Sequence, residues 1–358
     1  MAYELYASVD ELLAPETLTV LTGQPVKYVR CLPMEGGFSG SSLLNVEANS
    51  DKSAECFVLK RMSPKWDWVM AATNDQQCRS VTLWQTGLLD RLQPTIHHAT
   101  LACAHDGEGW ALLMRNVSAN MPVNPALTAA EVQCLLDTLA TLHATFWQAP
   151  QLADPDVGLC DTTGLLGAFS PPTAHQLPST TSPLPQMIIE GWGILQGMMA
   201  PDVADVLGNL FADPQPLCTT LARYPSTLVH GDYRTPHFAI DWQPGRQVVL
   251  LDWQLAGYTA ATIDLAWFLS MPDTLRSPVS TDAAIEYYRQ RLAERLGARF
   301  DESWWQPLLA LGKLVNVLRS VCFKAWFIVH PADELHQALE RRALATYTEE
   351  VRAALQWL

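Results

Sequence analysis

The chain has 358 residues, is 49% hydrophobic and carries a formal net charge of −14 at pH 7. This length allows a large core and suits two lobes better than one. The negative charge argues against a nucleic-acid partner, because binding to a phosphate backbone depends on clustered Lys and Arg.

Signals for a membrane, secreted or zinc-binding protein are missing from the sequence. No apolar run is long enough to cross a bilayer, and the N-terminus lacks the basic and apolar regions of a signal peptide. The eight cysteines are scattered without C-x-x-C spacing, which disfavours a disulfide framework and a zinc site. We therefore expect a cytoplasmic protein with no membrane partner, and the sequence leaves its oligomeric state open.

A glycine-rich turn separates the first two predicted strands, at residues 26–32 and 43–48. It reads Glu35-Gly36-Gly37-Phe38-Ser39-Gly40-Ser41-Ser42. Glycines let backbone N–H groups approach a phosphate closely, whereas the alternative interpretation is an ordinary hairpin turn. The segment matches neither G-x-G-x-x-G nor a Walker A loop, so on its own it favours the hairpin.

The next predicted strand, at residues 56–61, carries Lys60 near its end. Taken alone, such a lysine is most often solvated. Apolar residues then recur at spacings of three and four from Val81 to Leu92, and they predict a single amphipathic helix over residues 74–92. Strands near residues 101–104 and 110–114 complete this half of the chain.

The second half is predicted to be mainly helical. A capping box at residues 128–131 opens a helix, and His143 beside its apolar face is interpreted as a hydrogen-bonded core residue. Residues 150–186 are rich in Pro, Ser, Thr and Gly and are expected to form an insertion or a connector. Further helices are predicted over the following ranges: 187–222, 283–296, 302–329 and 332–358. Trp304, Trp305 and Trp326 on the last helices are expected in the core.

Two apolar strands in this half each deliver a carboxylate. The first leads into His230-Gly231-Asp232-Tyr233-Arg234-Thr235-Pro236-His237, and the second ends in Leu250-Leu251-Asp252-Trp253-Gln254. Two carboxylates on a hairpin-sized scaffold are what metal-assisted phosphoryl transfer needs, one to orient a hydroxyl and one to hold Mg²⁺.

These motifs resemble the aminoglycoside-phosphotransferase and choline-kinase-like superfamily. Its signature is His-Gly-Asp-x4-Asn followed by a strand that ends in Asp, and Asp-Trp-Gln is similar to its ecdysteroid-kinase-like branch. The resemblance implies an α+β, bilobal protein-kinase-like fold, with a small antiparallel β-sheet N-lobe with one main helix and a larger, mainly helical C-lobe. We expect a nucleotide-binding lobe at residues 1–116 and a catalytic and substrate lobe at residues 117–358.

The resemblance also implies a role for each motif residue. Asp232 is predicted to be the catalytic base, with His230 in the same loop, and Asp264 is predicted to brace that loop. Asp252 and His237 are the predicted metal ligands. ATP is expected to contact Lys60, Gly37, Ser39, Gly40, Met114 and Asn116. The predicted cofactors are ATP and Mg²⁺, with Mn²⁺ as the alternative ion.

Two positions depart from the family pattern. His237 stands where the family has a metal-binding Asn, and Ser80 stands where it has an acid that bonds the strand lysine, for which Glu55 and Asp75 are the available substitutes. Imidazole suits softer ions than Mg²⁺. His237 therefore binds metal through a water, selects an ion such as Mn²⁺, or marks a loss of catalysis.

The sequence thus supports three functions. The first, which we predict, is an ATP-dependent kinase that acts on a hydroxyl of a small molecule such as an aminoglycoside, choline, a sugar or a steroid-like alcohol. The second is a degenerate kinase-like protein that binds a nucleotide or metabolite without catalysis. The third is a metal-dependent hydrolase, but that reading leaves the glycine turn and Lys60 unexplained.

Overall fold

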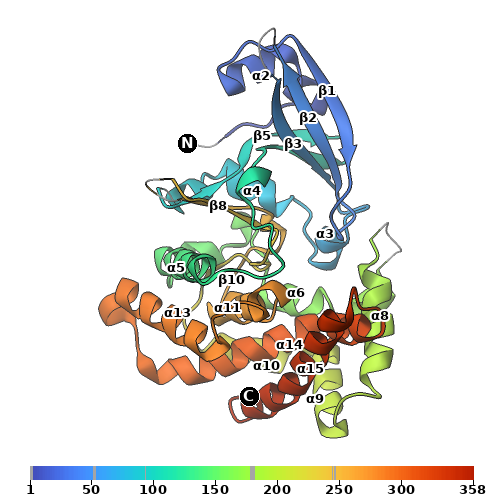
Figure 1. Ribbon diagram of the computed structural model, residues 1–358, viewed down its shortest axis with the longest axis vertical. Coiled ribbons are helices and arrows are strands. Elements are labelled where there is room, and N and C mark those ends of the chain that lie inside the picture. Colours follow the sequence, from blue (N-terminus) through green and yellow to red (C-terminus); the bar gives the residue numbers. More distant parts are fainter. Residues whose placement is uncertain (1–2, 51–53, 93, 178–181, 244, 246) are drawn as a thin grey trace.

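The computed structural model describes residues 3–50, 54–92, 94–177, 182–243, 245 and 247–358. Its five-stranded sheet lies at one end of the molecule and its longest helices at the other, with β8 and β10 between them (Figure 1). The strands are β1 (Tyr28–Met34), β2 (Ser42–Asn49), β3 (Ala54–Met62), β4 (Ile96–His98), β5 (Thr100–Asp106), β6 (Gly109–Arg115), β7 (Thr227–Val229), β8 (Phe238–Asp241), β9 (Gln247–Leu250) and β10 (Gly257–Thr259).

The first four helices are short, and the two longest lie at the end of the chain. The helices are α1 (Val9–Leu12), α2 (Pro15–Thr22), α3 (Trp68–Ala72), α4 (Arg79–Gln85), α5 (Ala129–Thr145), α6 (Thr162–Gly167), α7 (Pro171–Gln176), α8 (Leu184–Leu195), α9 (Pro201–Ala212), α10 (Gln215–Leu221), α11 (Thr262–Leu269), α12 (Pro272–Leu275), α13 (Thr281–Leu296), α14 (Trp305–Val329) and α15 (Glu334–Leu355). This arrangement confirms the predicted α+β class.

The N-terminal sheet is antiparallel and has the strand order β1-β2-β3-β6-β5. Alternation along β3 buries Phe57 and Leu59, which pack with Leu12 of α1 and Leu18 of α2. The register places Lys60 opposite Leu43 on one side and Leu112 on the other. Lys60 therefore lies in the middle of the sheet, and its side chain is buried.

The predicted helix over residues 74–92 is wrong in extent. Helix α4 begins only at Arg79 and ends at Gln85, and a 3₁₀ turn follows at Leu89–Leu92. Gly87 has φ +67°, a left-handed conformation that interrupts a right-handed helix. The apolar pattern is nevertheless kept in the core, because Val81, Trp84, Leu88 and Leu92 are all buried.

A second sheet joins the two halves of the chain. Strand β4 runs parallel to β9, with Ile96 opposite Val248, and β9 pairs with β8 as an antiparallel hairpin. The sequence analysis did not predict β4, which has only three residues. Strands β7 and β10 form a separate antiparallel pair, and together these strands place the two carboxylate motifs side by side.

The helical end is built around α14, which packs against α8, α11 and α15. The capping box at Thr128 and Glu131 opens α5 as predicted. Residues 150–186 differ from the predicted connector, since they contain α6, α7 and the start of α8; Pro and Ser open these short helices rather than prevent them. Residues 178–181 of that range lie outside the described residues.

Two further predictions concern side chains at this end. Trp304 and Trp305 are buried as expected, whereas Trp326 is partly exposed and donates its indole N–H to Glu190. All eight cysteines are unpaired thiols. In the part of the chain that the structure describes, no helix has the length and apolar character needed to span a membrane.

Candidate active site

The His230–Asp232 loop follows strand β7 and is held by a carboxylate from α11. Asp264 accepts hydrogen bonds from the backbone N–H groups of His230 at 2.6 Å and Gly231 at 2.8 Å. Gly231 has φ +80°, and a Cβ there would lie 2.0 Å from the carbonyl oxygen of Leu255. Only glycine fits this turn, and the predicted bracing role of Asp264 is confirmed.

His143 completes the support beneath the loop. It is fully buried, with Nε2 3.3 Å from the Asp264 carboxylate and Nδ1 2.6 Å from the Tyr288 hydroxyl. The interpretation of His143 as a hydrogen-bonded core residue is therefore confirmed.

His230 lies between the two carboxylate motifs. Its Nε2 is 2.8 Å from the carbonyl oxygen of Leu251, which can only accept, so Nε2 carries the hydrogen. Its Nδ1 then accepts the N–H of Asp232 at 3.3 Å. Burial lowers the pKa of His230, which keeps the ring neutral. His230 thus ties the loop of Asp232 to the strand that delivers Asp252, and both of its ring nitrogens are used.

Asp232 is surrounded by donors. Its Oδ1 accepts Nε of Arg234 at 2.7 Å and the indole N–H of Trp267 at 2.8 Å, while its Oδ2 is 3.3 Å from Nδ1 of His237. Burial raises the pKa of Asp232, but Arg234 and His237 outweigh this effect and hold the pKa well below its usual range. Asp232 is therefore an ionised hydrogen-bond acceptor at neutral pH.

Two supports of this loop were missed by the sequence analysis, Trp267 of α11 and Arg319 of α14. Arg319 is buried, donates to the carbonyl oxygen of Gly231 and stacks over the Trp267 ring at 4.5 Å. Both lie on helices with an ordinary apolar pattern. Only a charged residue within a buried helical stretch signalled Arg319.

Replacing Arg234 with methionine should raise the pKa of Asp232. A depressed carboxylate pKa stabilises the fold above the unfolded value of about 3.9, and this contribution is lost as pH falls through the folded value. The melting temperature of Arg234→Met should therefore lie below that of wild type at pH 7, and the gap should narrow below about pH 4. Arg30→Met, which removes an exposed arginine, is the matched control. A gap that stays constant down to acid unfolding would contradict the assignment.

Asp252 and Lys60 meet across the two halves of the chain. Lys60 Nζ is 2.8 Å from Oδ2 of Asp252 and 2.6 Å from Oε1 of Gln254. Burial raises the pKa of Asp252, but Lys60 and then His237 lower it, and the net shift is downward. Asp252 also has φ +61°, an uncommon conformation for a non-glycine residue.

Three consecutive residues at this point carry buried polar atoms without partners. Among the residues described, Oδ1 of Asp252, Nε1 of Trp253 and Nε2 of Gln254 have no hydrogen bond. Burying such atoms unpaired is costly, and a ligand that supplies both donors and acceptors would satisfy them. This is the observation that points most directly to a bound group beside Lys60.

His237 lies between the two carboxylates. Its Nδ1 is 3.0 Å from the carbonyl oxygen of Asp232, and its Nε2 is 3.8 Å from Oδ2 of Asp252. The structure thus brings the predicted metal ligands Asp252 and His237 together. Within the described ranges, no three His, Cys, Asp or Glu side chains form a complete metal-binding group. A cation here fits as an ion with two protein ligands, completed by phosphate oxygens and water.

The acid that was expected on α4 has no equivalent in the described structure. Ser80 lines the same small cavity as Lys60, Asp75 contacts Arg79, and Glu55 lies at the exposed start of β3. Lys60 instead donates a hydrogen bond to Gln254, which was named above only as part of the Asp-Trp-Gln motif. Arg79, a buried residue of α4, donates to the carbonyl oxygens of Gly158 at 2.8 Å and of Gln254, and so fixes α4 to that motif.

The glycine turn is held from below by Asp67. Its buried carboxylate accepts the hydroxyls of Ser39, at 2.8 Å, and Ser41. Gly37 and Gly40 have φ values of +83° and +97°. The Ser39 hydroxyl already donates its hydrogen to Asp67. We therefore expect Ser39 to contact a phosphate through its backbone N–H group. Asp67 was not anticipated, since it lies 28 positions from Ser39.

The two residues predicted to lie near adenine, Met114 and Asn116, differ in their surroundings. Met114 lines a cavity of about 20 Å³ with Lys60, Thr100 and Trp253, whereas Asn116 is exposed and accepts the N–H of Ser118. The structure therefore does not bring the Asn116 side chain into the site. A cavity of this volume holds about one water, so a purine enters only if the surrounding elements separate.

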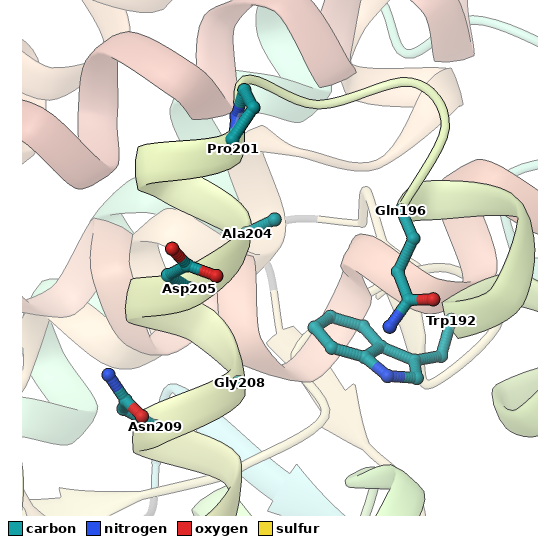
Figure 2. A pocket seen from close by; sticks show the side chains of 7 residues that line it. All are labelled: Trp192, Gln196, Pro201, Ala204, Asp205, Gly208 and Asn209. Atoms are coloured by element: carbon teal, nitrogen blue, oxygen red, sulfur yellow. The ribbon is translucent and has the colours of Figure 1, made fainter.

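A larger hollow lies elsewhere, between α8 and α9. It has a volume of about 550 Å³ and is lined by residues that include Trp192, Gln196, Asp205 and Asn209 (Figure 2). Trp192 and Gln196 project from α8 toward α9, which carries the two other residues. None of the site residues predicted from sequence lines it.

Comparison with known proteins identifies the family. A family model described as "phosphotransferase enzyme family" matches residues 39–308, more than half of the chain, and the match includes Lys60, Asp232 and Asp252. The chain belongs to this phosphotransferase family. The family prediction made from the two motifs is thereby confirmed, while placement of this phosphotransferase-family chain in the ecdysteroid-kinase-like branch stays a prediction.

Several solved structures are similar to this family member. A candidate aminoglycoside phosphotransferase from Ralstonia eutropha is 14% identical, with a TM-score of 0.50 over 95% of this chain and 98% of its own. A choline kinase from Streptococcus pneumoniae is 13% identical, with a TM-score of 0.49 over 93% and 97%. An ethanolamine kinase from Plasmodium vivax is 13% identical, with a TM-score of 0.48 over 89% and 82%. A search of curated proteins found no match.

Proposed function

We propose that this chain transfers the γ-phosphoryl group of ATP to a hydroxyl of a small molecule. The proposal rests on one continuous row of groups, Lys60, Asp252, His237 and Asp232, in which neighbours lie 2.8, 3.8 and 3.3 Å apart. The row combines a cation for phosphate, a pair of metal ligands and an ionised acceptor for a hydroxyl. Phosphoryl transfer needs these groups to be positioned, and it needs little covalent chemistry from the protein.

Each residue of the row has a proposed role. Asp232 accepts the hydrogen of the substrate hydroxyl through Oδ2, while Arg234 and Trp267 hold Oδ1 in place. The hydroxyl oxygen forms a bond to the γ-phosphorus as the bond to the leaving ADP oxygen breaks. The proton passes to Asp232 and then to solvent. A divalent cation held by Asp252 and His237 would neutralise negative charge on the transferring phosphates.

The nucleotide is proposed to enter where the buried atoms lack partners. Lys60 exchanges its contact with Asp252 for the phosphates. Unpaired donors are carried by Trp253, which lines the same cavity as Lys60, and by Gln254, which accepts a hydrogen bond from Lys60. We propose residues 1–116 as the nucleotide-binding lobe and residues 117–358 as the catalytic and substrate lobe. Their relative movement would widen the cavity beside Met114 to admit adenine.

A second candidate is a protein that binds a nucleotide or metabolite without catalysis. It is favoured by the small volume of the cavity, about 20 Å³, and by the pairing of Lys60 with Asp252, because transfer from ATP requires both to rearrange. In that case the unpaired atoms of residues 252–254 would serve recognition only.

Titration of ATP separates the two candidates. Wild type should bind ATP several-fold more tightly with a divalent cation than with EDTA, because the cation links Asp252 to the phosphates. Asp252→Ala should lose this several-fold gain. Asp282→Ala, on the exposed start of α13, is the matched control. Tight ATP binding that is identical with EDTA, together with no turnover against pooled alcohols, would instead support the non-catalytic binder.

A further inference from the structure

The histidine that replaces the expected asparagine has a fixed orientation. Nδ1 of His237 lies 3.0 Å from the carbonyl oxygen of Asp232, and a carbonyl can only accept. In the neutral ring the hydrogen therefore resides on Nδ1, and Nε2 carries a free lone pair. Metal-binding histidines are held in this way, with the second ring nitrogen bonded to a carbonyl or carboxylate that fixes the tautomer.

Nε2 of His237 lies near the Asp252 carboxylate. Two ligands of one ion, each at about 2.1 Å, stand about 3 Å apart at right angles and about 4.2 Å apart on opposite sides. The separation between Nε2 and Oδ2 of Asp252, 3.8 Å, falls within that interval and is too long for a hydrogen bond. The second oxygen of the same carboxylate, Oδ1, is buried without a partner.

From this geometry we infer that the site selects a first-row transition ion over Mg²⁺. This inference rests on the proposed function and deepens it by naming the ion class. Mg²⁺ strongly prefers oxygen ligands, whereas an imidazole nitrogen raises affinity along the series from Mn²⁺ through Co²⁺. The chain supplies one nitrogen and one carboxylate, and ADP or ATP phosphates supply oxygens. Carboxylate, carbonyl and water oxygens alone suit both Mg²⁺ and Mn²⁺.

The two carboxylates that face His237 already have cationic partners. Asp232, the nearest carboxylate, is already paired with Arg234, and Asp252 is already paired with Lys60. Both negative charges therefore have arginine or lysine partners without His237. When the nucleotide draws Lys60 to its phosphates, Asp252 is left with a charge that a cation beside Nε2 balances.

Pulsed EPR of bound Mn²⁺ tests the inference without reference to activity. Wild type with Mn²⁺, alone and with ADP, should show ¹⁴N modulation from a coordinated imidazole, and His237→Asn should lose it. His105→Asn removes an exposed histidine on β5 and should keep the signal. His237→Gln provides a second variant if the asparagine variant is unstable. Absence of ¹⁴N modulation in folded wild type would overturn the inference.

Calorimetry of ADP binding gives an independent readout. In wild type, Mn²⁺ and Co²⁺ should support tighter binding than Mg²⁺, and His237→Asn should reduce the Mn²⁺ to Mg²⁺ affinity ratio at least about tenfold. An equal ratio in both proteins would overturn the ion preference while leaving the proposed kinase intact. Histidine-coordinated Mn²⁺ without nucleotide binding would uphold the metal site and overturn the proposed function.

Discussion

Asp232→Asn should lower kcat for phosphoryl transfer by about a hundred- to ten-thousandfold, the range for loss of a positioned acid–base group. The asparagine keeps the size of the side chain, and its oxygen accepts Arg234 and Trp267 as the carboxylate does, at 2.7 and 2.8 Å. Only the charged acceptor for the substrate hydroxyl is lost. Affinity for ATP should therefore change by less than about threefold, because Asp232 contacts neither Lys60 nor the unpaired atoms of residues 252–254.

Steady-state kinetics with separate KM values for ATP and the alcohol tests whether kcat falls while ATP affinity stays nearly unchanged. Asp282→Asn, an exposed aspartate of α13, is the control for removal of one negative charge. A kcat loss below tenfold would remove Asp232 from the chemistry. A matching loss of ATP affinity would assign Asp232 to nucleotide binding instead.

Asp264→Ala should have the largest effect on stability. The fully buried carboxylate accepts two backbone N–H groups, from His230 and Gly231, and contacts His143. Removing it leaves these buried donors unpaired, and each such group costs about 1–3 kcal/mol. We expect a loss of about 4 kcal/mol in the free energy of unfolding, measured by urea denaturation with tryptophan fluorescence.

Asp264→Asn is the matched variant, since it keeps one oxygen acceptor and the shape of the side chain. It should recover part of the stability but not the charge that stabilises the loop N–H groups. If Asp264→Ala unfolded within 1 kcal/mol of wild type, the carboxylate would not be the main support of the catalytic loop.

The sequence was most informative where chemistry and local structure coincide. Pattern and spacing located the turn around Gly37, the strand of Lys60 and the carboxylates Asp232 and Asp252, and the resemblance to the family supplied their predicted roles. The capping box of α5 and the core position of His143 also followed from local spacing. These features depend on neighbours within a few residues, which a single sequence displays directly.

What the sequence did not reveal depends on distant contacts. Gln254 bonds Lys60 across 194 positions and Arg79 bonds Gln254 across 175, so no spacing rule connects them. The short strand β4 exists because it pairs with β9, far along the chain, and not because its three residues prefer the conformation. Helix α4 is shorter than predicted because Cys78, with φ +56°, and Gly87, with φ +67°, leave the helical conformation on either side of it while the apolar pattern continues.

These contacts give Lys60 different partners from the one predicted from the sequence. Lys60 was expected to be held by an acid on the helix that follows β3. In the structure Lys60 is held from the other half of the chain, by Asp252 and Gln254, and α4 contributes Arg79 instead. The residues that position the lysine and the residues that would bind the cation therefore belong to the same short segment.

The most direct test of the account follows the γ-phosphate of ATP by ³¹P NMR. The wild-type protein is incubated with ATP and a pool of amino alcohols, sugars and sterol-like alcohols. Mg²⁺ or diamagnetic Zn²⁺ serves as the cation, and Mn²⁺ is left out. The account predicts that the γ resonance disappears as ADP and a new phosphomonoester resonance appear in equal amounts, and that Asp232→Asn does not produce them. Bound ATP that stays intact with every acceptor and ion would contradict the assignment of this chain as a phosphotransferase acting on hydroxyl groups.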